Sequence, residues 1–292
     1  MSVDLTTEQI QAILKGTHIP PQPQILVDLQ MEQLMPDTDL EKIGKLISQD
    51  VGLSGKILKT VNAPSFGLAN NITSIKQAVN ILGVNSVVNL VNGLSIKGEL
   101  SNDDIIALGS FWDNAMEIAE ACAAIAKLIG YPTPDEAYTL GLFHNCGVPL
   151  LMMRFDNYQE VIQKSYARDN ASITDIENEL IQTNHAVVGY YVAKSWNLPL
   201  YISQAIHEHH NVEKIISDDK QNPQKRTLLT ILKMAENICG NYRNLGQQTE
   251  DHEWQRVSEQ VLEYVGLGQY DYETLCSQLI DMGIGVSDSL SF

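Results

Sequence analysis

The sequence predicts an all-α protein, and three observations lead to this prediction. Apolar residues recur at three- and four-residue spacing along most of the chain, as they do on the buried face of a helix. Residues that start and stop helices flank these segments, for example Thr133-Pro134 and Asn197-Leu198-Pro199. No convincing strand pattern and no internal repeat is present.

Composition sets limits on the function. The chain has 292 residues, 44% of them hydrophobic, which suits one large domain or two modest ones with a sizeable core. Lys plus Arg number 19 and Asp plus Glu number 36, so the formal net charge is −17. A chain this acidic repels phosphate groups and anionic lipid, and we therefore expect no binding to nucleic acid or to a membrane surface.

The compartment is expected to be the cytoplasm. No apolar stretch approaches the roughly 18 to 20 residues of a membrane span, and the N-terminus lacks a basic region followed by an apolar block. The four cysteines lie far apart without a CxxC pair, which favours reduced thiols over a disulfide framework or a zinc ribbon.

An N-terminal helical subdomain is predicted over residues 1–100. Its helices are expected over residues 40–47, 53–61, 75–82 and 84–94. Thr38 and Glu41 form a capping-box pattern before the first, and Gly83 is a typical C-cap after the third. The segment 62–71 is polar and contains glycine, and it could line a groove between subdomains that takes ligands or partner peptides. The polar segment 98–104 is the expected subdomain boundary.

A second helical subdomain is predicted over residues 101–240, followed by a C-terminal helical extension over residues 241–292. Thr133, Pro134 and Glu136 form a strong helix start, and Gly141 on that helix favours close approach of a neighbouring helix. The expected helices cover residues 105–129, 133–145, 158–166, 172–182, 185–196, 200–209, 228–239, 257–265 and 272–282.

Histidines concentrate in the second subdomain, on or beside its expected helices: His144, His185, His207, His209 and His210. Histidine is the commonest metal ligand, although a single buried histidine is more often a core residue with a satisfied hydrogen bond. Helical spacing predicts that His207 and His210 share a face and that His209 points elsewhere. The spacing also differs from the zincin motif, whose two histidines lie four residues apart.

Several blocks in order resemble the HDOD (HD-related output domain) family of bacterial signalling proteins, and the resemblance covers residues 18–240. The blocks are Ile19-Pro20-Pro21-Gln22-Pro23, Gln49-Asp50-Val51-Gly52-Leu53, Asn62-Ala63-Pro64-Ser65-Phe66-Gly67, Ile81-Leu82-Gly83, Gly141-Leu142-Phe143-His144-Asn145, His185-Ala186-Val187-Val188-Gly189, Trp196-Asn197-Leu198-Pro199 and His207-Glu208-His209-His210. The resemblance implies a multi-helix bundle like the HD domain, preceded by an N-terminal helical subdomain.

The HD superfamily, which this family resembles, contains metal-dependent phosphohydrolases. Their metal site uses a histidine on the long helix, a His-Asp pair, further histidines and a late aspartate. In this chain Asn114 stands near the first position, His144-Asn145 replaces the pair, and Glu236 or Asn237 stands at the last. His185 and His209 or His210 remain. The carboxylate that anchors two cations is thus replaced by a neutral amide, and we expect metal-activated hydrolysis to be lost.

Three function classes follow from this pattern. We expect first a non-catalytic signal-transduction module without a cofactor or bound metal, which acts on an unidentified protein partner in bacterial signalling and could form homo-oligomers. The alternative is a residual phosphohydrolase for nucleotides or cyclic dinucleotides, with one metal on His144, His185 and His209 or His210. However, Asn211-Val212-Glu213 stands where cyclic-dinucleotide phosphodiesterases carry Gly-Tyr-Pro. The third is a small-ligand receptor whose pocket uses these histidines and His207.

Overall fold

The computed structural model describes residues 14–17, 24–35, 39–49, 51–68, 71–95 and 109–285, and every regular element within these ranges is a helix. The predicted all-α class is therefore confirmed for the described part of the chain. Apolar residues at three- and four-residue spacing fall on one face of the chain only when it is helical, so this spacing favours helices.

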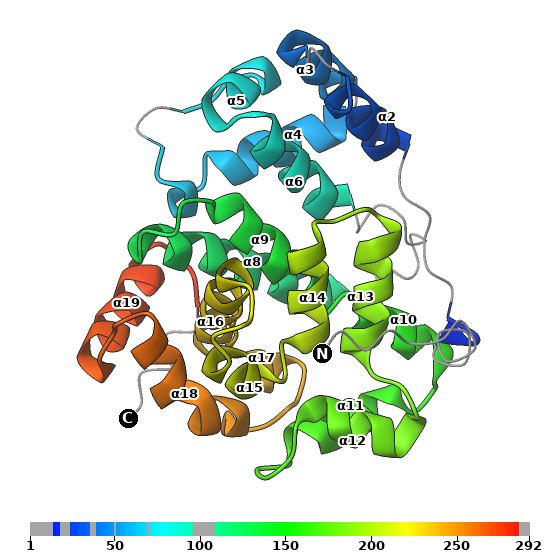
Figure 1. The fold of residues 1–292 in the computed structure, drawn as a ribbon, viewed down its shortest axis with the longest axis vertical. Coiled ribbons are helices and arrows are strands. Elements are labelled where there is room, and N and C mark those ends of the chain that lie inside the picture. The colour runs from blue at the N-terminus through cyan, green and yellow to red at the C-terminus, as the bar shows by residue number, and fades with distance from the viewer. Residues whose placement is uncertain are drawn as a thin grey trace.

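The helices of the N-terminal part lie together at one end of the molecule, coloured blue to cyan in Figure 1. They are α2 (Gln24–Gln33), α3 (Leu40–Ser48), α4 (Val51–Val61), the short 3-10 helix η1 (Pro64–Phe66), α5 (Ile75–Leu82) and α6 (Val84–Ser95). The predicted C-cap of α5 is confirmed, because Gly83 adopts a φ of 84° there. Helix α3, in contrast, is capped by Asp39, whose side chain accepts the backbone N–H of Glu41 at 2.8 Å.

Two hydrogen bonds join the residue after α4 to the segment before α5. The Asn62 amide donates to the Ile72 carbonyl oxygen at 2.8 Å, and its own oxygen accepts the Ile72 backbone N–H at 2.7 Å. This pair of bonds ties the two ends of the connector together. The groove that the sequence suggested between the subdomains is lined by other segments, described below. The predicted capping residue Thr38 and the predicted boundary at 98–104 lie outside the described residues.

The remaining helices form the larger part of the molecule, coloured green to red (Figure 1). They are α8 (Gly109–Leu128), α9 (Pro134–Phe143), α10 (Gly147–Arg154), α11 (Tyr158–Tyr166), α12 (Ile173–Ile181), α13 (His185–Ser195), α14 (Leu200–Glu208), α15 (Val212–Ser217), α16 (Pro223–Ile238), α17 (Asn241–Asn244), α18 (His252–Tyr264) and α19 (Gln269–Asp281).

Helices α8, α9 and α16 pack against one another and form the centre of this part. The predicted close approach at Gly141 is confirmed: a Cβ at that position would lie 2.8 Å from the Ala119 Cα and 3.0 Å from the Cys122 Sγ. Helix α6 packs on α9 and joins the N-terminal helices to this centre. Helix α9 therefore contacts both parts of the molecule.

The C-terminal helices complete the same core. Helix α18 packs on α15 and α16, and α19 packs on α8, so the extension covers the second subdomain (Figure 1). The four cysteines are buried free thiols, which confirms the predicted absence of a disulfide framework. Within the described ranges, no helix combines the length and apolar character needed to cross a bilayer.

Candidate functional site

His185 is the first residue of α13, and two neighbours fix the start of that helix. The Asn184 side chain caps it by accepting the Val187 backbone N–H at 2.8 Å. Gly147 at the start of α10 lets α13 approach closely, because a Cβ there would lie 2.1 Å from the His185 carbonyl oxygen. The cap and the close approach of α10 therefore position the backbone of His185, whose side chain is fully buried.

His209 and His210 follow the last residue of α14, and both are buried against His185. His209 keeps helical backbone angles, and its Nε2 and that of His210 both face the His185 ring. The predicted pairing of His207 with His210 on one face is therefore wrong. The His207 ring lies instead beside Tyr190, with 5.5 Å between the ring centroids, and the structure does not bring it to the other histidines.

Three imidazole nitrogens converge at the centre of the site. The His185 Nε2 lies 3.3 Å from the His209 Nε2 and 3.1 Å from the His210 Nε2. One ligand atom from each ring can be chosen so that all three lie within 4.8 Å of one another. We call His185, His209 and His210 the histidine cluster.

The outer nitrogen of each ring faces a hydrogen-bond acceptor. The Nδ1 of His185 lies 2.7 Å from the Glu177 carboxylate, that of His209 lies 2.7 Å from the Ile206 carbonyl, and that of His210 lies 2.8 Å from the Glu253 carboxylate. Carbonyl and carboxylate oxygens only accept, so we infer that each Nδ1 carries the proton. In a neutral ring the inner Nε2 is then unprotonated and carries a lone pair. Three such lone pairs that face one another repel unless a cation or a proton lies between them.

His144 lies at the edge of the cluster. It follows α9, its Nδ1 donates to the Gly141 carbonyl at 2.6 Å, and its ring centroid is 5.4 Å from that of His209. Its Nε2 lies 3.5 Å from the Glu236 carboxylate. The structure thus brings together His144, Glu236 and the histidine cluster, as the resemblance to the HD superfamily implies.

A buried ammonium group balances the carboxylates at this edge. The Lys233 Nζ lies 2.7 Å from the Glu236 carboxylate and 2.8 Å from the Glu253 carboxylate. Asn241 donates a further hydrogen bond of 3.1 Å to Glu236. Lys233, Glu236 and Asn241 are all buried, and Glu253 is largely buried, so these charges are held in a region of low dielectric constant.

Asn114 and Asn145, the two asparagines expected at metal-ligand positions, occupy different surroundings. Asn114 on α8 donates to the Asn241 side chain at 3.1 Å and so touches the site through one intermediate residue. Asn145 is 2% exposed, and its Oδ1 accepts no hydrogen bond from the described residues. A buried amide oxygen of this kind could contact a cation, but as a neutral group it cannot offset the charge of two.

Burial changes the proton affinities of this site. Burial together with the neighbouring Lys233 and histidine rings lowers the pKa of His209 and of His210 well below the ordinary value. Burial would raise the pKa of the Glu236 carboxyl, but Lys233 and His144 overcome it and hold that pKa far below its usual range. The His209 and His210 rings are therefore neutral at pH 7, which is the state that binds a metal.

The histidine cluster fits one transition-metal ion. Imidazole nitrogens bind zinc at about 2.0–2.1 Å, which places neighbouring nitrogens of a tetrahedral site about 3.4 Å apart, close to the separations found here. Glu177 and Glu253 accept hydrogen bonds from the outer nitrogens, as carboxylates commonly do when they orient metal-binding histidines. The donor set of the described residues thus suits a single ion bound by His185, His209 and His210.

A cavity of about 220 Å³ reaches the cluster from the surface. His210 and Glu253 line its inner end, while Lys214 and Arg256 stand among its outer residues. This volume is below the roughly 300–1,000 Å³ of typical ligand pockets. The cavity is large enough for an ion with water to pass, but it is small for a nucleotide.

Sequence reasoning missed Glu177, Lys233 and Glu253. Each is a charged residue on a helix, and that pattern usually indicates a solvated face. Glu177 and Glu253 contact histidines 8 and 43 positions away along the chain, so no local spacing reveals these contacts. Lys233 lies three residues before Glu236, but this spacing is equally common on an exposed helix face. The one local signal is the placement of Lys233 and Glu236 within the apolar second half of α16.

Comparison with known proteins places these features in a family. Residues 19–212 match the HDOD domain. An uncharacterised protein of Treponema pallidum is 28% identical over 195 residues, which cover 66% of this chain and 38% of that protein. The cyclic di-GMP phosphodiesterase CdgJ of Vibrio cholerae is 26% identical over 132 residues, which cover 45% of this chain and 30% of CdgJ. The chain therefore spans about a third of the length of these relatives.

A solved structure shares the whole fold. The HDOD domain protein of Geobacter sulfurreducens superimposes with a TM-score of 0.65 at 19% identity, and the match covers 98% of each chain. At this identity the likeness concerns the arrangement of the helices. It includes the C-terminal helices, which lie beyond the residues that match the family.

Proposed function

We propose that this chain, which belongs to the HDOD domain family, is a regulatory module that acts by binding and does not hydrolyse phosphoesters. The single observation that carries the proposal is the engagement of every carboxylate at the histidine cluster. Glu177 binds His185 and Tyr158, Glu253 binds His210 and Lys233, and Glu236 pairs with Lys233. Among the described residues, none of these carboxylates is left to bridge two cations.

Asn145 supports the same conclusion. Two divalent cations about 3.5–4 Å apart need shared negative charge to offset their repulsion. The amide of Asn145 supplies none, and the ammonium of Lys233 adds a positive charge beside the position where a second ion would need anions. We therefore infer that the site holds one ion at most, with a structural role for it.

The name of one relative, CdgJ, is that of an enzyme, but we do not propose that enzyme activity for this chain. CdgJ is named a cyclic di-GMP phosphodiesterase, and the aligned residues cover only 30% of it. The activity in that name therefore need not belong to the shared segment. Binding without turnover agrees with the altered ligand set of this chain and with the signalling context of the HDOD family.

A second candidate is hydrolysis by a single metal ion, and the three converging nitrogens favour it. An ion held by three histidines can act as a Lewis acid and leaves a coordination position open. Against it, His185 and His209 are fully buried and His210 is 5% exposed. The cavity of about 220 Å³ next to them is small for a nucleotide substrate. The same size weighs against the hypothesis of a nucleotide receptor at these histidines.

A hydrolysis assay on metal-loaded protein tests the proposal. The full chain is loaded in turn with Mn²⁺, Fe²⁺ and Zn²⁺ and incubated with bis(p-nitrophenyl) phosphate, nucleoside triphosphates and cyclic di-GMP. We expect rates no higher than those of the His209→Ala variant, whose cluster is broken. Turnover that disappears in His209→Ala but persists in His207→Ala, the matched control outside the cluster, would refute the proposal.

A further inference from the structure

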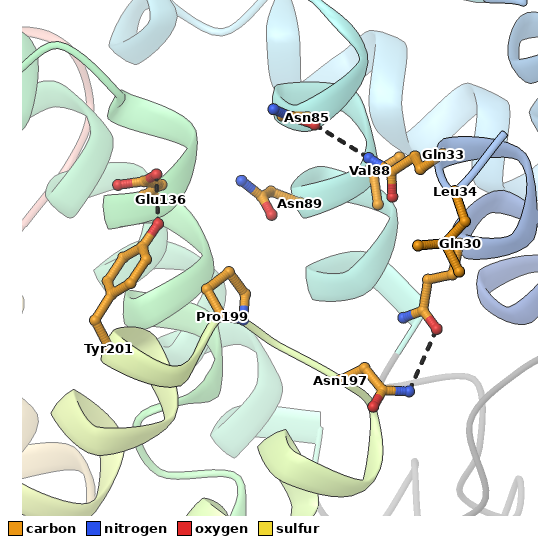
Figure 2. Close-up of a pocket in the computed structure, with 10 residues that line it drawn as sticks. All are labelled: Gln30, Gln33, Leu34, Asn85, Val88, Asn89, Glu136, Asn197, Pro199 and Tyr201. Atoms are coloured by element: carbon orange, nitrogen blue, oxygen red, sulfur yellow. Dashed lines mark hydrogen bonds between the residues drawn. The ribbon is translucent and has the colours of Figure 1, made fainter. Parts of the chain in front are cut away.

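A larger cavity of about 550 Å³ lies between the N-terminal helices and the second part of the molecule, apart from the histidine cluster (Figure 2). Helices α2 and α6 form one side of it. The start of α9, the turn between α13 and α14, and the first turn of α14 form the other. We call it the amide groove. Its volume falls within the range of about 300–1,000 Å³ that is typical of ligand sites.

Carboxamides dominate the lining. Half of the ten lining residues are asparagine or glutamine, and they come from three separate segments: Gln30, Gln33, Asn85, Asn89 and Asn197. No Lys, Arg or His occurs among the described residues that line the groove. Each carboxamide offers two donors and one acceptor oxygen, so the walls present both kinds of group to a ligand.

These carboxamides keep hydrogen-bonding capacity beyond the bonds they form with each other. Gln33 donates to the Asn85 Oδ1 at 3.1 Å, which leaves the Asn85 amide hydrogens as donors. Asn89 donates to the Asp135 carboxylate at 3.0 Å, which leaves its oxygen as an acceptor. Figure 2 shows the Asn89 side chain extending into the middle of the cavity, between α2 and Glu136.

The charge of the groove excludes anionic ligands. The Glu136 carboxylate lies on the wall opposite α2 and accepts hydroxyl hydrogen bonds from Tyr201 at 2.6 Å, Thr133 at 2.8 Å and Tyr131 at 3.0 Å. These three donors hold it in place. No basic side chain of the described lining offsets its charge, and the buried Asp135 carboxylate behind Asn89 adds to it. A phosphate-bearing ligand would meet only negative charge here.

Apolar side chains border the same cavity. Leu34 at the end of α2 is 85% exposed, and Val88 and Pro199 complete the apolar part of the lining. A purely apolar ligand would leave the carboxamides without the hydrogen bonds that water now provides, which is costly. The ligand must therefore combine a row of donors and acceptors with small apolar groups. A peptide main chain in extended conformation has this composition.

We propose that the amide groove binds an extended, neutral or basic segment of a partner protein. The carboxamides of α2 and α6 would pair with main-chain N–H and C=O groups, Glu136 would select against acidic side chains, and Leu34 would contact an apolar one. This inference rests on the proposed function, because it names the kind of partner that the binding module would take. It uses no residue of the histidine cluster.

A peptide selection tests this inference. A random dodecapeptide library displayed on phage is selected against the full-length protein, and the Kd of synthetic copies of the enriched peptides is measured by calorimetry. The variants are Asn85→Ala and Leu34→Asp, both at exposed positions where folding is expected to persist. Gln159→Ala, an exposed carboxamide on α11 away from the groove, is the matched control.

We expect an enriched peptide family poor in Asp and Glu, with Kd raised at least tenfold by Leu34→Asp and severalfold by Asn85→Ala, and unchanged by Gln159→Ala. The inference is overturned if no family is enriched, if the enriched peptides are acidic, or if all three variants bind them equally. Because the assay measures no hydrolysis, a failed peptide selection and a failed proposed function are separate results.

Discussion

Lys233 is a buried ammonium group held between two buried or largely buried carboxylates, and the proposed one-ion site depends on this arrangement. Its pKa is raised, because Glu236 and Glu253 outweigh the opposing effect of burial. A charged group in this position needs its partners, since an unpaired charge in a region of low dielectric constant is costly. The stability of the site should thus depend on Lys233 more than on any exposed ion pair.

Replacing Lys233 tests that dependence. We expect Lys233→Met to lower the free energy of unfolding by about 3–5 kcal/mol at pH 7, because Glu236 and Glu253 would remain buried without a counter-charge. Urea denaturation measures the loss. Lys164→Met is the matched control, since Lys164 forms an exposed pair with Glu160 and should contribute about 0–1 kcal/mol. Equal losses in the two variants would contradict the assigned role of Lys233.

The histidine cluster should make the protein sensitive to mild acid. His209 and His210 have pKa values far below about 6.5 in the fold, while in the unfolded chain they titrate near 6.5. Above pH 6.5 the two histidines are neutral in both the folded and the unfolded chain, so they do not lower the free energy of unfolding. As the pH falls below 6.5 the unfolded state takes up protons first, and each histidine removes about 1.4 kcal/mol per pH unit until its folded pKa is reached.

The measurement is the urea midpoint of metal-free protein at pH 7.5, 6.5 and 5.5. We expect little change between the first two and a clear fall between the last two. In His209→Gln the fall should be reduced, because one of the two groups no longer titrates. A midpoint that rises, or stays constant, between pH 6.5 and 5.5 would show that the cluster is not held neutral.

At the level of elements, α13 positions the cluster through its N-terminal cap. We expect Asn184→Ala to lower stability by about 0.5–2 kcal/mol, because the Val187 N–H loses its acceptor, and to weaken zinc binding through His185. Asn184→Ser, which restores a capping oxygen, should recover most of both. Thermal unfolding and a competitive zinc titration measure the two effects. If Asn184→Ser behaved like Asn184→Ala, capping would not be the cause.

The elements also show what local sequence can predict. Helices with a clear apolar face and a cap, such as α3, α5 and α13, follow from spacing alone. Helix α10 was missed because its Gly147 and Pro149 indicate a turn, although both are tolerated in a first helical turn. Helix α2 was missed as well, since only Leu26 and Leu29 mark its buried apolar face.

The site was predictable in part. His144 and Glu236 were identified through resemblance to a family and lie beside the histidine cluster. The direction of His207 could not be predicted from spacing, because its ring packs beside Tyr190 on α13, which is a contact between two helices. Glu177 and Glu253 act through contacts with residues distant in sequence. Periodicity describes one element at a time, so it cannot reveal such contacts.

At the scale of the whole molecule, the C-terminal helices belong to the site. The family match ends at residue 212, yet Lys233, Glu236 and Glu253 all follow it. Helices α9 and α14 connect this region to the amide groove. Glu136, in the first turn of α9, lines the groove, and His144, which follows the last residue of α9, lies beside the histidine cluster. These two residues lie about 12 Å apart along the helix axis.

Removing the last helices should therefore affect the whole fold. We expect a chain that ends at Gln248 to lose cooperative thermal unfolding, because α18 and α19 cover apolar residues of α16, α15 and α8 and supply Glu253. Circular dichroism followed with temperature measures this. The Glu253→Gln variant separates the loss of one carboxylate from the loss of packing. A truncated chain that unfolds like the full chain would show that the extension is dispensable.

Counting metal ions in a crystal shows directly whether the site binds more than one cation. Crystals of the full chain are grown with excess Mn²⁺, and an anomalous difference map is calculated from data collected near the manganese edge. We expect a single peak, if any, between His185, His209 and His210. Two peaks about 3.5–4 Å apart, with Glu236 bound to the second ion and no longer paired with Lys233, would contradict the proposed one-ion site.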